Sequence, residues 1–277
     1  MKHTPLISVI TPTFNQGRFI GEAIASVELQ SYNNCEHLVI DGMSTDVTAS
    51  IMRDLMERRQ HPCISWISEP DTGQSEALNK GFKLAKGDII GWLNSDDRYL
   101  PNCFEHVVRV FDENPQVDIV YGDYRLVNEL GNSIQTRREI EFSAFVLQYH
   151  RVLYIPTTTT FFRRKIFDEG NWINEDLHYA MDFDFFLRLA ARGYQFRHIS
   201  EVLADFRYQI NSKTCSFPEK QQMEHQQIIF KTAPIFRHIN SLHIRKIILS
   251  CLRLLASMKR YSEKAYKGYY WEQLRSN

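Results

Sequence analysis

The sequence predicts an α/β protein in which a mostly parallel sheet is flanked by helices. In residues 1–123, short runs rich in β-branched residues alternate with segments of helical periodicity, which is typical of βαβ units. Polar residues directly follow these runs, at the edge where open parallel sheets bind ligands. With 277 residues, 43% of them hydrophobic, the chain can form one large domain or a domain with a helical appendage.

The first half of the chain supplies the predicted parallel strands and the helices between them. Ile7–Thr13 is a β-branched run, and apolar residues recur at helical spacing from Ile20 to Val27. The later predicted strands are His37–Asp41, Cys63–Ser68, Asp88–Asn94 and Val117–Tyr121. The later predicted helices are Thr48–Leu55, Ser75–Lys86 and Pro101–Phe111. Asp46 or Thr48 can cap the first of these, while Gly87 and Asn114-Pro115 end the other two.

After about Tyr124 the pattern changes to short strands and loops, with a turn at Leu130-Gly131-Asn132. Helical spacing returns at Asp182–Arg192, a strand is predicted at Phe196–Ala204, and helices are predicted after Pro218. We therefore divide the chain into a larger domain (1–216) and a C-terminal helical extension (217–277). Within the first, residues 1–123 form the alternating strand-and-helix half and 124–216 the mixed half.

The formal net charge is zero, with 33 basic and 33 acidic residues, but the charge is unevenly distributed. Residues 1–216 hold 22 basic and 29 acidic side chains, and residues 217–277 hold 11 and 4, so the balances are −7 and +7. The whole chain lacks the basic excess expected of a nucleic-acid-binding protein. Five scattered cysteines without a CxxC pair indicate reduced thiols in a cytoplasmic protein.

The residues at the ends of four predicted strands are mostly polar. The most suggestive polar ones are Thr11, Thr13, Asn15, Asp41, Asp71, Ser95, Asp96 and Asp97, and Phe14 and Gly73 stand among them. One polar loop is ordinary, but several carboxylates at one edge repel each other unless a cation or a donor-rich ligand is bound there. Asp96 and Asp97 could hold Mg²⁺ or Mn²⁺ through oxygen ligands. The first strand is followed by neither GxGxxG nor GxxxxGK[ST], which argues against a dinucleotide dehydrogenase and a P-loop NTPase.

Four ordered motifs resemble the family 2 glycosyltransferases of the GT-A fold. They are ISVITPTFN (7–15), VIDGMSTD (39–46), SEPDTGQSEALNKG (68–81) and NSDD (94–97), and the resemblance extends through Asp182 and Ser212. It implies a Rossmann-like sheet and metal-dependent, inverting transfer of a sugar from a nucleoside-diphosphate sugar. It further implies that 1–216 is the GT-A catalytic domain, with residues 1–123 as its nucleotide-sugar-binding half and 124–216 as its acceptor-side half. The loop Thr11–Asn15 (Thr11, Thr13, Phe14 and Asn15) and Asp41 would then hold the nucleoside.

The resemblance places the metal on Asp96, with Asp97 as an additional ligand. Asn94 stands where the family has the first Asp of its Asp-x-Asp motif, and it can still bind a ribose or a water. Gly73, Asn79, Lys80 and Ser95 fall in the matching segments that line the donor pocket, although Asn79 and Lys80 could equally lie on an exposed helix face.

The family's catalytic base is a carboxylate at the start of a late helix, where this chain has Asp182 and Asp184. Asp184 can pair with Arg188 four residues on, whereas Asp182 has no such partner and takes the family position, so we choose Asp182. The alternative is that Asp182 only caps its helix. Gln209 stands where the family commonly has His, and Arg207 could supply the missing positive charge to a phosphate or be a surface residue.

These residues predict a hexosyltransferase acting on a saccharide or lipid-linked acceptor in exopolysaccharide, capsule or lipopolysaccharide synthesis. The alternatives are a sugar-phosphate nucleotidylyltransferase and a catalytically silent nucleotide-sugar-binding scaffold. Neither a secretory signal nor a membrane span is predicted, so we expect a cytoplasmic location. In the C-terminal extension, apolar residues between Ile244 and Leu255 form one face among basic residues, which leaves two partners open: a protein surface, including a second copy, or the inner face of the membrane.

Overall fold

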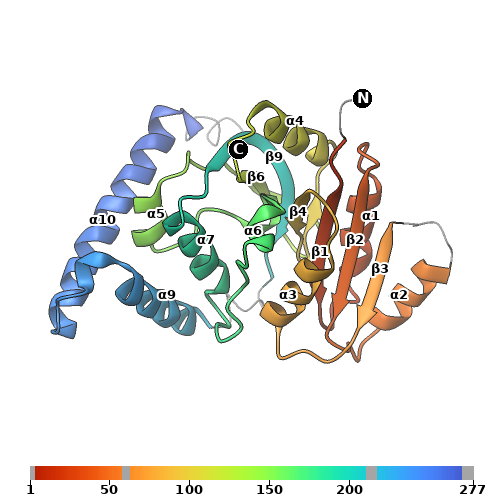
Figure 1. The fold of residues 1–277 in the computed structure, drawn as a ribbon, viewed down its shortest axis with the longest axis horizontal. Helices are drawn as coiled ribbons and strands as arrows, with labels where there is room; N and C mark the ends of the chain where they lie inside the picture. Colours follow the sequence, from red (N-terminus) through yellow and green to blue (C-terminus); the bar gives the residue numbers. More distant parts are fainter. Residues whose placement is uncertain (1–3, 58–62, 210–216, 270–277) are drawn as a thin grey trace.

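The computed structural model describes residues 4–57, 63–209 and 217–269 (Figure 1). Its first half alternates strands and helices as expected. The strands are β1 (Ile7–Thr13), β2 (Cys35–Asp41), β3 (Ile64–Ser68) and β4 (Ile89–Trp92). The helices are α1 (Ile20–Glu28), α2 (Thr48–Glu57), α3 (Gln74–Leu84) and α4 (Cys103–Glu113). Asp46 accepts a hydrogen bond from the Thr48 N–H at 2.9 Å, so it caps α2.

The second half adds shorter elements around five further strands. They are β5 (Arg98–Tyr99), β6 (Ile119–Val127), β7 (Ser133–Arg137), α5 (Ala144–Tyr149), a 3₁₀ turn (Thr157–Thr159), β8 (Thr160–Arg163), α6 (Lys165–Asp168), α7 (Met181–Ala191) and β9 (Phe196–Arg207). Two helices follow, α9 (Pro218–Thr232) and α10 (Leu242–Tyr266), with a 3₁₀ turn (Pro234–Phe236) between them. Strand β6 runs six residues beyond the predicted end at Tyr121, because β9 pairs with it as far as Val127 and Arg207.

All the described strands join one sheet in the order β3-β2-β1-β4-β8-β6-β9-β5, with β7 beside β6. Strands β1 to β4 are parallel, and β8 is antiparallel to both β4 and β6. The carboxyl ends of β1, β2, β3 and β4 therefore meet at one edge. This is the predicted mostly parallel sheet, followed by a mixed region.

Apolar clusters cover both faces of the sheet. One cluster joins β1 and β4 to α1 and α4 through residues such as Val27, Phe104 and Phe161. A larger cluster joins α3, α5 and α7 and includes Trp92, Phe162 and Phe186. Together they hold the strand ends in fixed positions, since tightly packed cores resist deformation.

The C-terminal helices share the larger cluster through residues such as Ile229 and Leu249. Figure 1 shows α9 and α10 at the side of the molecule opposite β3. The predicted boundary near residue 216 lies outside the described residues, so the division into 1–216 and 217–277 stays a prediction. Within the described ranges, no helix combines the length and the apolar character needed to cross a bilayer.

Candidate active site

The loops after β1 and β2 are joined by a network around Asp41 and Asn15. The buried Asp41 carboxylate accepts hydrogen bonds from the Ser44 N–H at 3.0 Å, the Ser44 hydroxyl at 2.5 Å and the Ser68 hydroxyl at 2.7 Å. Asn15 has a left-handed φ of 53°, and its side-chain oxygen accepts a bond from the Thr45 N–H at 2.8 Å. The left-handed region is tolerated by asparagine, so this residue suits the position.

A second carboxylate, Asp71 after β3, lies beside the first. A Cβ added to Gly42 would meet the Asp71 carboxylate oxygen at 2.6 Å, so the Asp71 side chain lies close against the backbone of the loop after β2. Burial raises the pKa of Asp71, and the negative charges of Glu76 and Asp41 raise it further. Two strand ends thus do bring carboxylates together, as the loop pattern predicts.

Three residues of the β1 loop differ in exposure. The Thr11 hydroxyl is buried and lies 2.8 Å from the Nε2 of His37, whose pKa burial lowers to about 3. Thr13 is also buried, and its hydroxyl has no hydrogen-bond partner in the part of the chain that the structure describes. Phe14, by contrast, is 57% exposed and presents its ring to solvent. A direct ligand contact by Thr11 is therefore not supported, whereas Phe14 is accessible.

The acidic loop after β4 (Asn94–Asp97) is held from several sides. Asn94 accepts hydrogen bonds from the Trp92 indole at 2.9 Å and the Gln74 amide at 3.0 Å, and it donates to Asp97 at 3.3 Å. Its amide is thus committed to the protein, and the expected ribose contact of Asn94 is not supported. Ser95 is buried in the same loop.

Asp97 is the buried carboxylate of the acidic loop and is 2% exposed. Its carboxyl accepts hydrogen bonds from the Thr158 hydroxyl and from the Arg207 N–H, the latter at 2.8 Å. Burial, together with the charge of Asp96, raises its pKa to about 8. Because the carboxyl is buried and both of its oxygens are bonded to the protein, this geometry does not support the predicted role of Asp97 as a metal ligand.

Asp96 is the more accessible carboxylate of the acidic loop. Its Oδ2 accepts a hydrogen bond from the Gln209 amide at 2.6 Å, and no described residue donates to its Oδ1. No group of three or more His, Cys, Asp or Glu side chains suited to a metal occurs in the described ranges. One carboxylate oxygen nevertheless fits Mg²⁺ or Mn²⁺ when substrate phosphates and water supply the other ligands, as is usual for Mg²⁺.

Arg207 is a buried residue that contacts the backbone of the acidic loop. Its side chain is 1% exposed, pairs with Glu22 at 2.6 Å and donates to the Asp96 carbonyl at 2.8 Å. The guanidinium also lies 4.8 Å above the Phe19 ring. Arg207 is therefore neither a surface residue nor free to contact a diphosphate. A direct contact with phosphate is not supported, and the contacts of Arg207 instead hold the acidic loop in place.

Helix α3 carries the two remaining donor-pocket candidates. Asn79 is buried; it donates to the Ile173 carbonyl and to Glu175, and it accepts from the Ile173 N–H, each at 2.7 to 2.9 Å. All its polar atoms are thus bonded to the protein, and it fixes α3 to the segment before α7 rather than facing a ligand. Lys80 forms ion pairs with Glu69 at 3.0 Å and Glu76 at 3.1 Å.

The start of α7 presents Asp182. The Asp182 carboxylate accepts a hydrogen bond from the Phe183 N–H at 2.8 Å, and burial raises its pKa to about 6, with the charge of Glu224 raising it further. Asp184 is paired with Arg188 at 2.7 Å, as the helical spacing predicts. Asp182 is therefore the carboxylate without a cationic partner, and its pKa suits proton transfer near neutral pH.

Sequence reasoning missed Glu224, which lies on α9. Its carboxylate accepts hydrogen bonds from the Tyr179 N–H at 2.8 Å and the Ala180 N–H at 2.9 Å, in the turn directly before Asp182. The two contact residues are 44 positions apart in the sequence, so no local sequence pattern predicts this contact.

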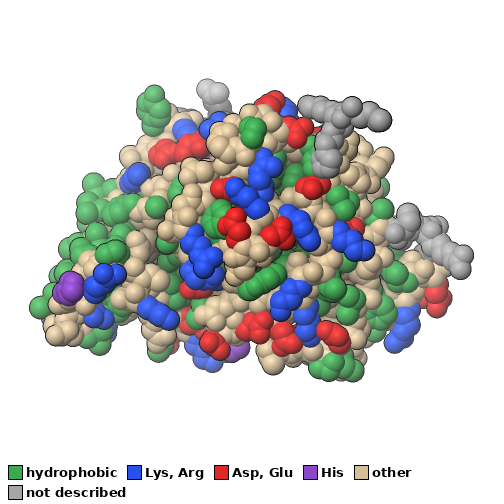
Figure 2. Space-filling model, in the orientation of Figure 1, with side chains coloured by type: hydrophobic (Ala, Val, Ile, Leu, Met, Phe, Trp, Pro, Cys, Tyr) green, Lys and Arg blue, Asp and Glu red, His purple; other side chains and the backbone are tan. Residues whose placement is uncertain are grey.

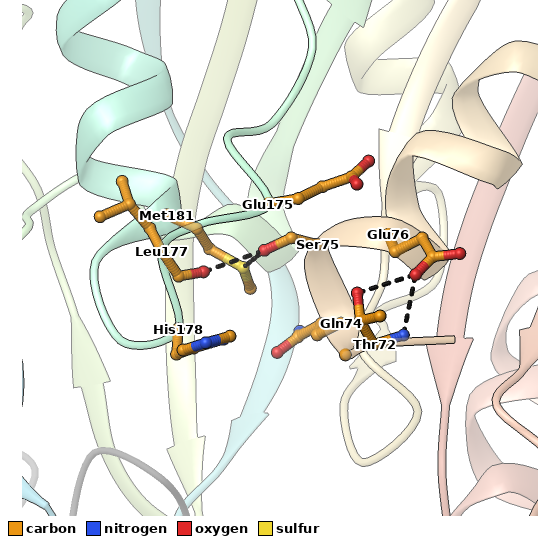
Figure 3. A pocket seen from close by; sticks show the side chains of 9 residues that line it. Thr72, Gln74, Ser75, Glu76, Glu175, Leu177, His178 and Met181 are labelled. Carbon is orange, nitrogen blue, oxygen red and sulfur yellow. Dashed lines mark hydrogen bonds between the residues drawn. The ribbon is translucent and has the colours of Figure 1, made fainter. Parts of the chain in front are cut away.

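A pocket lies between the start of α3 and the segment that leads into α7 (Figure 3). Gly73 and Gln74 line it on the α3 side, and residues between Glu175 and Met181 line it on the α7 side. The Ser75 hydroxyl lies 3.2 Å from the Leu177 carbonyl and 2.8 Å from the Met181 sulfur, which fixes the two sides together. Gln74 also reaches Asn94, so the pocket adjoins both the acidic loop and the residue before Asp182.

Fold and site together define an α/β protein with several carboxylates gathered around the carboxyl ends of parallel strands, of which Asp71 and Asp96 are partly exposed. The family model "Glycosyl transferase family 2" matches residues 8–170, which is more than half of the chain. The chain therefore belongs to glycosyltransferase family 2. This assignment favours a glycosyltransferase over the sugar-phosphate nucleotidylyltransferase alternative.

Curated relatives agree with this family. An uncharacterised glycosyltransferase of Rickettsia typhi is 28% identical over 224 residues, covering 76% of this chain and 64% of that protein. Chondroitin synthase of Escherichia coli is 27% identical over 209 residues, covering 73% of this chain and 29% of that protein. This chain thus spans less than two thirds of the length of either relative.

Solved structures confirm the GT-A fold. Staphylococcus aureus TarS in complex with UDP-GlcNAc superposes with a TM-score of 0.67 at 19% identity, covering 89% of this chain and 71% of that one. The mannosyltransferase PcManGT from Pyrobaculum calidifontis, in complex with GDP-Man and Mn²⁺, gives 0.65 at 19% identity, covering 92% and 70%.

Proposed function

We propose that this protein is an inverting glycosyltransferase that moves a sugar from a nucleoside-diphosphate sugar to a hydroxyl of a saccharide or lipid-linked acceptor. The observation that carries the proposal is the placement of Asp182. It is a carboxylate with a pKa raised to about 6, next to a pocket that Gln74 links to the acidic loop.

The nucleoside binds at the ends of β1, β2 and β3. Phe14 offers an exposed ring on which a base can stack, and the partly exposed Asp71 offers a carboxylate acceptor to base or ribose donors. Asp41 is buried and bonded to Ser44 and Ser68, so its predicted direct contact with the nucleoside is not supported, and it instead joins the loops. The Asn15 N–H donates to the Ser44 hydroxyl at 2.8 Å, which joins the loop after β1 to the loop after β2. Complexes with UDP-GlcNAc and GDP-Man in structures of similar fold support a donor of this class.

The diphosphate lies next to the acidic loop, with Gly73 and the start of α3 beside it. A helix start carries unpaired N–H groups and a partial positive charge, which favour an anion. Asp96 would hold Mg²⁺ or Mn²⁺, which when bound offsets the negative charge that develops on the leaving diphosphate. The Mn²⁺ in the PcManGT complex supports this choice of metal.

Asp182 then accepts the proton of an acceptor hydroxyl as its oxygen attacks the anomeric carbon. The bond between that carbon and the diphosphate oxygen breaks on the opposite face, and nucleoside diphosphate leaves. A base placed in this way contributes typically ~10²–10⁴-fold to the rate. Attack opposite the leaving group inverts the anomeric configuration.

Chondroitin synthase and hyaluronan synthase are among the relatives, which supports a role in building a bacterial surface polysaccharide. The chain lacks the QxxRW signature of processive synthases, so we propose transfer of one sugar per encounter.

The proposal is tested by incubating the protein with a panel of nucleotide sugars and Mn²⁺ and measuring nucleotide release. Slow, metal-dependent release from one or two donors is the expected result. Saturable donor binding without release, on every donor and acceptor tried, would instead support a catalytically silent scaffold.

A further inference from the structure

Helix α10 carries a continuous apolar stripe on its exposed side, which we call the α10 face. It comprises Ile244, Ile247, Leu254, Leu255, Met258 and Tyr261, and each of these side chains is 49% to 63% exposed. At about 100° per residue, all six lie within roughly a third of the helix circumference. Figure 2 shows hydrophobic side chains along the edge of the molecule where Figure 1 places α10.

The opposite side of α10 anchors it to the protein. Leu249 and Ala256 are buried in the larger apolar cluster. The buried Glu139 pairs with Arg260 at 2.7 Å and with Lys264 at 3.2 Å. Because these contacts fix the rotation of the helix, the α10 face cannot turn inward without breaking a buried ion pair, which is costly.

The surroundings of the α10 face are basic. From residue 225 to residue 262 the chain has seven Lys and Arg and no Asp or Glu. Helical geometry places exposed Lys259 on one side of the stripe and exposed Lys246 on the other. An apolar stripe with cations on both sides matches an anionic surface above an apolar layer.

The same charges disfavour a second copy of the chain as the partner. A two-fold contact would place the α10 face against itself and bring the lysines of both copies together. Paired helices normally carry opposite charges beside the seam, and this stretch has no acidic residue to provide them.

We propose that the α10 face docks the protein on a membrane surface rich in anionic phospholipid, with α10 lying in the plane of the interface. The apolar side chains enter the boundary between headgroups and acyl chains, and Lys246 and Lys259 contact lipid phosphates. This proposal does not depend on the sugar-transfer mechanism.

The test is flotation of the full chain with vesicles of phosphatidylglycerol and phosphatidylcholine, and with vesicles of phosphatidylcholine alone. We expect binding to the anionic vesicles that weakens as salt is added. Ile247→Ser with Leu254→Ser should reduce this binding at least tenfold, and Lys246→Gln or Lys259→Gln about fivefold each. Leu130→Ser, at a leucine 77% exposed on the β6–β7 turn, is the matched control and should bind like the original protein.

Equal binding by the Ile247→Ser, Leu254→Ser variant and the original protein would overturn the proposal. So would a failure of the original protein to bind anionic vesicles. Sedimentation velocity distinguishes the competing partner: a dimer that these two substitutions dissociate, without any vesicle binding, would assign the α10 face to a second copy. Unchanged thermal unfolding of each variant confirms that lost binding is not lost folding.

Discussion

The acidic loop and the start of α7 each present one carboxylate to the proposed site, but their nearest charges have opposite signs. Asp96 lies close to the buried cation Arg207, which opposes the rise in its pKa that burial causes. Asp182 lies close to the anion Glu224, which adds to the effect of burial. Arg207 thus partly offsets the effect of burial at Asp96, which suits a ligand for a cation, whereas at Asp182 burial and the neighbouring anion both favour uptake of a proton.

Asp182→Asn should have the largest effect, because the amide cannot accept the proton. We expect kcat to fall ~10²–10⁴-fold while donor affinity stays within about threefold. Stopped assays of nucleotide release and titration calorimetry with the donor measure the two quantities. Asp184→Asn is the matched control, since Asp184 is engaged by Arg188. Wild-type turnover by Asp182→Asn would remove Asp182 as the base.

Asp96→Ala should lower kcat/KM by about 100-fold or more and, unlike Asp182→Asn, should abolish the Mn²⁺ dependence of donor binding. Asp97→Asn provides the contrast within the same loop. Because Asp97 is buried and bonded to Thr158, its replacement should lower thermal stability but leave the metal dependence of donor binding in place. The assignment fails if Asp97, rather than Asp96, proves necessary for that dependence.

The pH dependence of kcat/KM should show an acidic limb near pH 6, since Asp182 must be ionised to accept a proton and its pKa is about 6. As the ionised fraction of Asp182 falls, kcat/KM should decrease about 30-fold from pH 7.5 to pH 4.5. Glu224→Gln keeps an oxygen for the Tyr179 and Ala180 N–H groups but removes the negative charge. The limb should therefore move to lower pH, whereas Glu219→Gln, at an exposed position on the same helix, should leave it in place.

The smallest expected effect is on stability. Because the pKa of Asp182 is raised on folding, the folded state binds its proton more tightly than the unfolded chain between about pH 4 and 6, and stability falls as pH rises through that range. Because asparagine does not titrate, the Asp182→Asn variant does not lose stability in this way. The variant should be more stable at pH 7.5 by on the order of 1 kcal/mol, and the gain should vanish below pH 4 in chemical denaturation.

The sequence predicts the parallel half of the fold well, because each strand and helix there has its own local pattern. It also places Asp41 and Asp96 at or just after the ends of parallel strands and Asp182 at the start of a helix. It fails where a side chain's surroundings come from distant segments. Asp97 cannot be distinguished from Asp96 until Thr158 is seen beneath it, and Arg207 cannot be recognised as buried until Glu22 is seen beside it.

The most direct test of the central claim is the anomeric configuration of the product. Proton NMR of the sugar released from an α-linked nucleotide sugar with Mg²⁺, recorded in the first minutes before mutarotation, reports the stereochemistry of the transfer. The account predicts that β-configured sugar forms first, because attack assisted by Asp182 comes from the face opposite the diphosphate. Initial formation of the α-configured sugar would contradict it.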